Sequence, residues 1–164
     1  GPAMANDTAK NPANGPGPRR RQIHLTEAEQ AEFLAANRKA ALATIDRDGC
    51  PHLVAMTYGV KDGVFYMTSY GKAQKVLNIQ RNPKVGLMIE AGASYGELKG
   101  VMVRGTCEIL EGEEAVREAW TIIAGDAGRQ RRRETNDSAP KRVALKVTPT
   151  RIVTWDHTKL GGRY

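Results

Sequence analysis

Four residues near the middle of the chain are of the types that bind an anionic group: Ser69, Gly71, Lys72 and Lys75. They lie where an apolar, strand-like run is predicted to pass directly into a helix, in or beside its first turn. The first backbone N–H groups of a helix have no partner within it, and the helix dipole is positive at that end. Hydroxyl and ammonium groups there add charge-assisted hydrogen bonds. The pattern predicts a phosphate site for a phosphorylated cofactor, and a solvated surface turn is the alternative interpretation.

The elements around this corner are predicted from capping and turn signals. The sequence TEAE at residues 26–29 has the form of a capping box, the DG pairs at 48–49 and 62–63 are typical of tight turns, and the NP pair at 82–83 ends a helix. We expect helices over residues 26–37, 72–80 and 113–123, and strands over residues 40–46, 51–60, 64–68, 85–90, 99–110, 142–147 and 150–155.

These elements predict a mainly β (α+β) fold. Short connections between successive strands favour antiparallel pairing, and residues 40–68 are expected to form a three-stranded meander. Gly105, within the longest predicted strand, indicates a bulge of the kind that lets a sheet curl. We therefore expect an antiparallel β-barrel of about six or seven strands with about three helices.

The chain of 164 residues is long enough for one domain with a single core. Residues 1–4, GPAM, resemble the scar of a protease cleavage, and residues 5–18 are rich in Pro and Gly and hold no large apolar side chain. We expect a disordered tail over residues 1–22, a domain over residues 23–156 and a C-terminal tail over residues 157–164. No apolar run approaches the roughly 20 residues that span a bilayer, and no secretory signal is recognised. A cytoplasmic protein with no membrane partner is expected.

The net charge of +7 comes largely from Arg19–Arg21 and from the arginines within Arg129–Arg133. Charge clustered in polar segments without interleaved aromatic residues is weak evidence for a nucleic-acid binder, so we expect no nucleic-acid partner. The segment Arg129–Arg133 is interpreted either as a lid that holds an anionic tail or as a solvated loop.

No metal site and no catalytic triad are expected. Cys50 and Cys107 match neither a CxxC redox pair nor a zinc-ligand set, and His24, His52 and His157 are widely spaced. The HExxH and P-loop motifs are absent from the sequence. Such a chain suits an enzyme in which a bound cofactor does the chemistry.

Three segments carry a resemblance to a known family: AALATIDRDGCPHLVAMTYGVKDGVFYMTS at residues 40–69, KAQKVLNIQRNPKVGLMIE at 72–90 and KGVMVRGTCEILE at 99–111. In order and spacing, the region from about Leu25 to Trp155 resembles the pyridoxamine 5'-phosphate oxidase-like split β-barrel. Within that fold it is most similar to the flavin and deazaflavin oxidoreductases.

The resemblance implies a homodimer with two cofactor sites between the protomers. The second strand would line the ring and ribityl chain, the third strand would continue the groove, the following turn would bind the phosphate, and the opposing protomer would add residues near Trp155 and His157. The cofactor-binding residues implied in this way are Ala55, Met56, Thr57, Met67, Thr68, Ser69, Lys72, Lys75 and Trp155.

The resemblance also limits the substrate. True pyridoxamine 5'-phosphate oxidases end in an Arg-Leu-x-Pro pattern used in substrate binding, whereas this chain ends in KLGGRY at residues 159–164. We expect coenzyme F-420, with flavin mononucleotide (FMN) as the alternative cofactor, because the oligoglutamate tail of F-420 suits the basic groove residues. The expected function is hydride transfer between reduced F-420 and a small unsaturated or conjugated acceptor. The alternatives are an FMN-dependent oxidoreductase or a non-catalytic flavin, haem or tetrapyrrole carrier.

Three further residues have two interpretations each. His157 is either a proton donor beside the substrate or an exposed residue at the end of a strand. Trp155 and Tyr95 either stack on the ring or the substrate, or serve packing and dimer contact.

Overall fold

The computed structural model describes residues 19–125 and 137–161. Its strands are β1 Lys39–Ile45, β2 Pro51–Thr57, β3 Gly59–Lys61, β4 Val64–Tyr70, β5 Lys84–Ala91, β6 Lys99–Leu110 and β7 Arg142–Asp156. The α-helices are α1 Arg19–Gln22, α2 Glu27–Ala36, α3 Gln74–Arg81 and α4 Glu113–Ala124. Short 3-10 helices cover Tyr95–Glu97 (η4), Ala139–Lys141 (η5) and His157–Leu160 (η6). None of the helices in these two ranges is long and apolar enough to cross a membrane.

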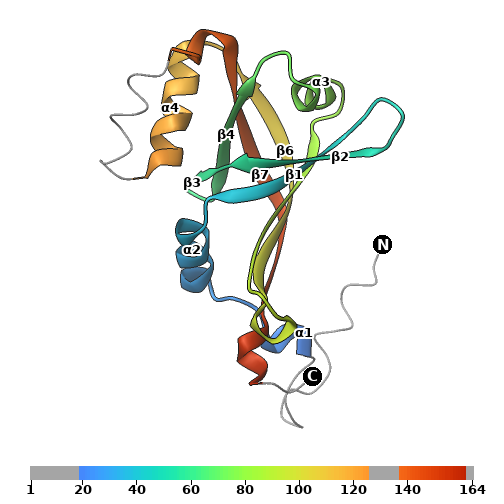
Figure 1. Cartoon of the computed structure of the whole chain (residues 1–164), viewed down its shortest axis with the longest axis vertical. Coiled ribbons are helices and arrows are strands. Elements are labelled where there is room, and N and C mark those ends of the chain that lie inside the picture. The colour runs from blue at the N-terminus through green and yellow to red at the C-terminus, as the bar shows by residue number, and fades with distance from the viewer. Residues whose placement is uncertain (1–18, 126–136, 162–164) are drawn as a thin grey trace.

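The seven strands form one antiparallel sheet in the order β2-β1-β5-β6-β7-β4-β3 (Figure 1). β2 and β3 lie at opposite edges of this sheet, yet Tyr58 alone separates them in the chain. A single residue can join the two edges only if the sheet curls until they meet. The side chain of Tyr58 is buried at this junction, and its hydroxyl donates to the carbonyl of Leu34 at 2.7 Å. The predicted antiparallel barrel is thus confirmed.

The prediction of one continuous strand over residues 51–60 is wrong, because two strands, β2 and β3, cover this region. β2 pairs with β1, whereas β3 pairs with β4, so the region forms two hairpins and not a three-stranded meander. The break falls at Tyr58, whose backbone N–H donates to the carbonyl of Arg38 at 3.1 Å outside the β1–β2 ladder. No local turn signal in the sequence marks this break. The position of β3 at the far edge of the sheet is therefore set by the tertiary fold.

The two strands expected at residues 142–147 and 150–155 are also corrected, because β7 is continuous through Pro149. Its register against β6 shifts between Arg104 and Gly105, where Thr150 is the extra residue. Pro149 lies opposite Gly105, at this bulge, where the ladder is irregular and tolerates the missing N–H. The bulge predicted from Gly105 is confirmed, and a Cβ atom there would lie only 2.8 Å from the carbonyl oxygen of Thr148.

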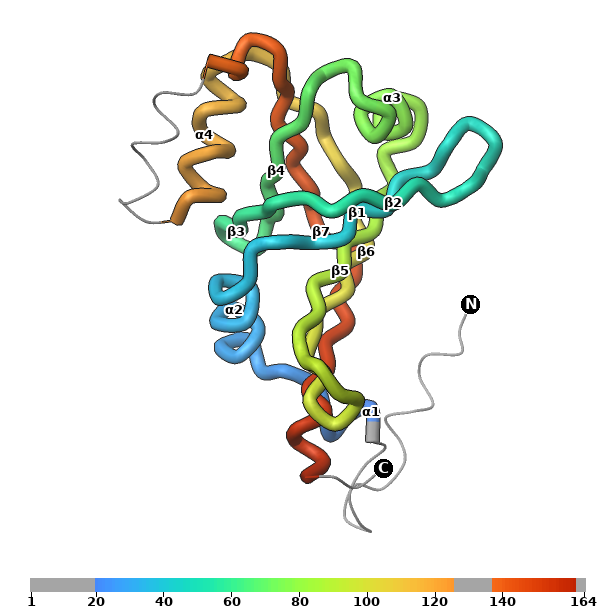
Figure 2. Tube along the Cα trace, in the orientation of Figure 1, coloured from blue at the N-terminus to red at the C-terminus, as the bar shows by residue number. Residues whose placement is uncertain are grey.

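The core lies inside the curled sheet and follows the two-residue alternation of the strands. Its largest fully buried aliphatic and aromatic side chains include Leu42, Phe65, Met67, Leu87, Ile89 and Leu145. α4 packs over β3, β4 and β7, α3 lies at one end of the barrel, and β5, β6 and β7 extend beyond the barrel in the other direction (Figures 1 and 2).

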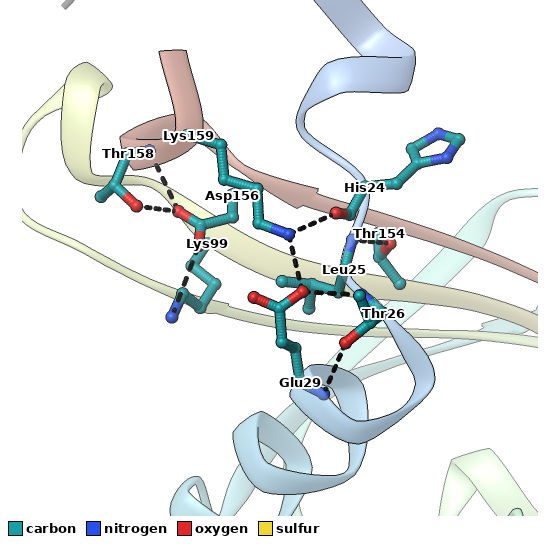
Figure 3. Close-up of polar contacts among 9 residues, drawn as sticks. All are labelled: His24, Leu25, Thr26, Glu29, Lys99, Thr154, Asp156, Thr158 and Lys159. Carbon is teal, nitrogen blue, oxygen red and sulfur yellow. Dashed lines mark hydrogen bonds and ion pairs between the residues drawn. The ribbon is translucent and has the colours of Figure 1, made fainter. Parts of the chain in front are cut away.

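Hydrogen bonds and an ion pair tie the start of the described chain to its end (Figure 3). The backbone N–H of Leu25 donates to Thr154 Oγ1 at 2.9 Å, and Lys159 Nζ contacts the carbonyl of His24 at 2.8 Å and Glu29 Oε1 at 2.6 Å. The helices α1 and η6 lie within residues 1–22 and 157–164, the two ranges that were expected to be tails. The disorder expected for residues 1–18 lies outside the described residues, and the domain boundaries stay a prediction.

Candidate functional site

The corner between β4 and α3 is the region predicted to bind phosphate. β4 continues to Tyr70, and the backbone N–H of Ala73 donates to the carbonyl of Tyr70 at 3.1 Å, which closes a tight turn through Gly71 and Lys72. α3 therefore begins at Gln74, two residues later than predicted. Lys72 lies in the turn and is exposed, whereas Lys75 is the second residue of the helix and is partly buried.

No side chain caps the first turn of α3. Its N-cap residue is Ala73, which has no side chain to accept from the helix N–H groups, and no acidic residue occupies the first turn. Lys75 is present there although a cation near a helix N-terminus opposes the dipole. Burial and then repulsion by the guanidinium of Arg142 lower the pKa of Lys75. An anion at this corner would satisfy the helix N–H groups and the ammonium together.

Arg142 was not recognised as a site residue from the sequence. It begins β7 and pairs in register with Tyr70 at the end of β4. Its guanidinium carbon lies 4.2 Å from the centroid of the Tyr70 ring, and its Nε donates to Ser138 Oγ at 2.9 Å. Nothing in the local sequence separates Arg142 from any basic residue at the start of a strand, so only the β4–β7 pairing reveals it.

The three predicted residues of β4 support the corner from within the fold. Met67 is fully buried in the core and Ser69 is 3% exposed, with its hydroxyl donating to the carbonyl of Tyr70 at 3.0 Å. Thr68 Oγ1 accepts from Trp120 Nε1 at 3.0 Å, which links the strand to α4. Met67 and Ser69 thus have almost no surface to offer a ligand within one protomer.

The predicted residues of β2 lie on a different part of the surface. Ala55 and Thr57 are exposed on the outer face of the sheet, while Met56 points inward and is 9% exposed. Ala55 lines an open groove of about 400 Å³ on this outer face, where Leu53 and Met88 are also exposed. The full lining consists of Lys39, Ala40, Ala41, Leu53, Val54, Ala55, Met88 and Glu90.

Trp155 lies at the opposite end of β7 from Arg142. Its indole ring covers Gly100, where an added Cβ atom would come within 2.4 Å of the ring, and its Nε1 donates to Glu90 Oε2 at 3.0 Å. At about 3.3 Å per residue, β7 separates Trp155 from Arg142 by roughly 40 Å along the strand. The structure therefore brings Ser69, Lys72 and Lys75 to one corner, but it does not bring Trp155 to them within one chain.

His157 is held by η4. Its Nδ1 lies 2.8 Å from the carbonyl oxygen of Tyr95, and the two rings meet edge to face with centroids 4.6 Å apart. A backbone carbonyl can only accept, so Nδ1 must carry a proton in this contact. A neutral His157 therefore has the lone pair on Nε2, and proton donation from Nε2 requires the imidazolium form.

Two other expectations concern regions away from this corner. The interpretations of Arg129–Arg133 as a lid or as a solvated loop lie outside the described residues. Among residues 19–125 and 137–161, no group of three or more His, Cys, Asp and Glu side chains is placed to hold a metal ion.

Comparison with known proteins gives both a family match and structural matches. Residues 26–156 match the model of a family described as pyridoxamine 5'-phosphate oxidase. No match was found among curated proteins.

Three solved structures illustrate the structural similarity. A conserved hypothetical protein from Mycobacterium tuberculosis is 34% identical, with a TM-score of 0.78 over 90% of this chain and 94% of the other. A 5-nitroimidazole antibiotic resistance protein from Bacteroides thetaiotaomicron, so named as putative, is 21% identical, with a TM-score of 0.64 over 80% and 85% of the two chains. A protein named F-420 reductase is 23% identical, with a TM-score of 0.58 over 74% and 93%.

Proposed function

The chain belongs to the pyridoxamine 5'-phosphate oxidase family, and on this premise we propose that it is a homodimeric, cofactor-dependent oxidoreductase that uses the deazaflavin coenzyme F-420. The acceptor is a small molecule with an unsaturated or conjugated electron-poor bond. The observation that carries the proposal is the β4–α3 corner, where an uncapped helix start and two lysines meet.

The residues at this corner fit the phosphate of such a coenzyme. Ala73 provides no capping oxygen, so the first N–H groups of α3 are available to phosphate oxygens. Lys72 and Lys75 supply the positive charge, and Lys75 is partly buried, which makes its attraction for an anion stronger than in bulk water. The resemblance to deazaflavin oxidoreductases and the F-420 reductase among the similar structures favour F-420 over FMN.

The ring system requires a second protomer. Ala55 and Thr57 are exposed beside a groove in which Leu53 and Met88 are 65% and 44% exposed, an apolar surface that a second copy of the chain would cover. Trp155 lies at the opposite end of β7 from Arg142 and the β4–α3 corner, too far to contact the same ligand within one chain, so the second copy would supply it. The cofactor would then lie between Ala55, Met56 and Thr57 of one protomer and Trp155 of the other.

When bound, the coenzyme supplies the hydride that reduces the acceptor. The protein binds the phosphate, orients the ring and excludes water. His157, near Trp155 at the end of β7, would donate the accompanying proton from Nε2 in its imidazolium form, because its Nδ1 is held by Tyr95.

The proposal is tested by parallel titration of the purified protein with F-420 and FMN, followed by an assay of acceptor-dependent oxidation of reduced F-420. Tighter binding of F-420 and acceptor-dependent oxidation would support the proposal. Tighter binding of FMN with turnover would make the protein an FMN-dependent oxidoreductase. Tight binding of either ring without turnover on quinones, enones or biliverdin would indicate a carrier and would overturn the enzymatic assignment.

A further inference from the structure

Arg142 is held in place at the β4–α3 corner by contacts on two sides. Its guanidinium stacks on Tyr70 at 4.2 Å, its Nε donates to Ser138 Oγ at 2.9 Å, and its guanidinium carbon lies 5.9 Å from the ring centroid of Trp120. Trp120 is fixed in turn by its hydrogen bond to Thr68. Two aromatic rings and a hydroxyl thus restrain a long side chain, so less conformational entropy is lost when it binds a ligand.

The neighbour of this arginine is a second cation. Lys75 is partly buried, and burial first and then the charge of Arg142 lower its pKa. None of the three ion pairs found among the described residues includes Lys75 or Arg142. Two like charges close together, one of them partly desolvated, raise the free energy of the unliganded protein, and a bound anion would relieve that cost.

The chemistry of the pair indicates the kind of anion. Because Nε is bound to Ser138, the terminal Nη1 and Nη2 groups are the remaining donors of Arg142, and they form a planar fork that matches two oxygens of one phosphoryl group. Lys75 adds a compact point charge. The contact with the Tyr70 ring restrains the position of this fork.

We propose that Arg142 is a direct ligand of the cofactor phosphate, and that it binds the phosphoryl oxygens together with Lys75. The site is thus built from the β4–α3 corner and from the start of β7, which lies far away in the chain. This inference rests on the proposed cofactor-binding function, but it concerns the phosphoryl group alone and does not depend on hydride transfer.

The test compares a phosphorylated ring with the same ring lacking phosphate. FMN and riboflavin are titrated into the full-length wild-type protein and into Arg142→Met, which keeps an apolar stem on Tyr70 and removes the charge. We expect the ratio of the riboflavin Kd to the FMN Kd to fall by about tenfold to a hundredfold in Arg142→Met, as the loss of a charge-assisted hydrogen-bonded pair predicts. Arg151→Met removes an exposed arginine from the other half of β7 and should leave the ratio unchanged.

An unchanged ratio in a folded Arg142→Met variant would overturn the assignment. If that variant fails to fold, or if neither ring binds, inorganic phosphate titrated into the wild-type protein decides the question by NMR. The guanidinium signal of Arg142 and the ε-carbon signal of Lys75 should then shift together with one Kd, and shifts at neither residue would refute the site. Failure of the F-420 turnover assay with these phosphate effects intact would reject the enzymatic function and leave the site standing.

Discussion

The N-termini of α2 and α3 are built in opposite ways. At α2, Thr26 Oγ1 accepts from the backbone N–H of Glu29 at 3.1 Å, and Glu29 Oε1 accepts from the N–H of Thr26 at 2.8 Å. Two acidic residues in the first turn of α2 complement its dipole. At α3, Ala73 offers no cap, the first turn holds no acidic residue, and Lys75 places a positive charge where the dipole is already positive.

This difference separates a helix end that caps itself from one that is left without a cap. The capping box of α2 satisfies its own N–H groups, and Glu29 is also paired with Lys159 from the far end of the chain. The end of α3 forgoes a cap that is typically worth about 1 kcal/mol, and it gathers cations in place of acids. The N-terminus of α3, at the corner that is proposed to bind an anion, is therefore less stable than it would be with a cap.

The largest expected effect comes from removing the charge at the open end. Lys75→Ala should weaken cofactor affinity by several-fold to about a hundredfold, because a charge-assisted hydrogen bond to phosphate is lost. Fluorescence titration with F-420 and FMN measures this change. Unaltered affinity in Lys75→Ala would exclude Lys75 from the site. The difference between the N-termini of α2 and α3 would then have no connection with cofactor binding.

The next effect comes from making α3 resemble α2. Ala73 has the extended backbone of an N-cap, with φ −66° and ψ 151°, close to the φ −68° and ψ 166° of Thr26, so an acidic cap fits without strain. Ala73→Asp should raise the free energy of unfolding by about 1 kcal/mol, while its carboxylate repels the phosphate and lowers cofactor affinity by roughly tenfold. Urea denaturation and ligand titration measure the two effects. Ala73→Ser, which caps without charge, is the matched control and should stabilise α3 with a smaller loss of affinity.

Breaking the cap of α2 should affect stability alone. Thr26→Ala removes the oxygen that accepts from Glu29 N–H and is expected to lower the free energy of unfolding by about 1 kcal/mol. Cofactor affinity should be unchanged, because α2 contributes no residue to the proposed site. A marked loss of affinity in Thr26→Ala would show that the two helix ends are coupled, contrary to the comparison.

The smallest effect is a pH dependence at the same cap. The hydrogen bond from Lys159 is the largest cause that lowers the pKa of Glu29 to about 2, and the backbone hydrogen bond from Thr26 adds to it. A carboxyl group whose pKa is lower in the folded state stabilises the protein above its unfolded pKa, and this contribution is lost as the pH falls from about 4.5 towards 2. Because Glu29 is solvent-accessible, the effect should be modest. Glu29→Gln should flatten the pH profile of urea unfolding in this window, and an identical profile would contradict the assignment.

Signals that act over a few residues determined much of this protein. The capping box at Thr26 and the bulge at Gly105 form as the sequence predicts. Gly49 and Gly63 adopt the positive φ values of 86° and 76° that their Asp-Gly turns require. The count of seven strands also agrees, although for compensating reasons, because one predicted strand divides at Tyr58 and two others merge through Pro149.

The tertiary structure decided which distant residues share a surface. Arg142 reaches the β4–α3 corner only because β7 pairs with β4, and Trp155 is removed from that corner by the length of the same strand. The lysines could be recognised from the sequence since the turn and helix that present them are contiguous. Local signals depend on the hydrogen bonding and φ preferences of neighbouring residues, whereas the pairing of distant strands depends on how the whole core closes. For that reason the sequence alone predicted an anion site at this corner, and only the folded sheet placed Arg142 beside it.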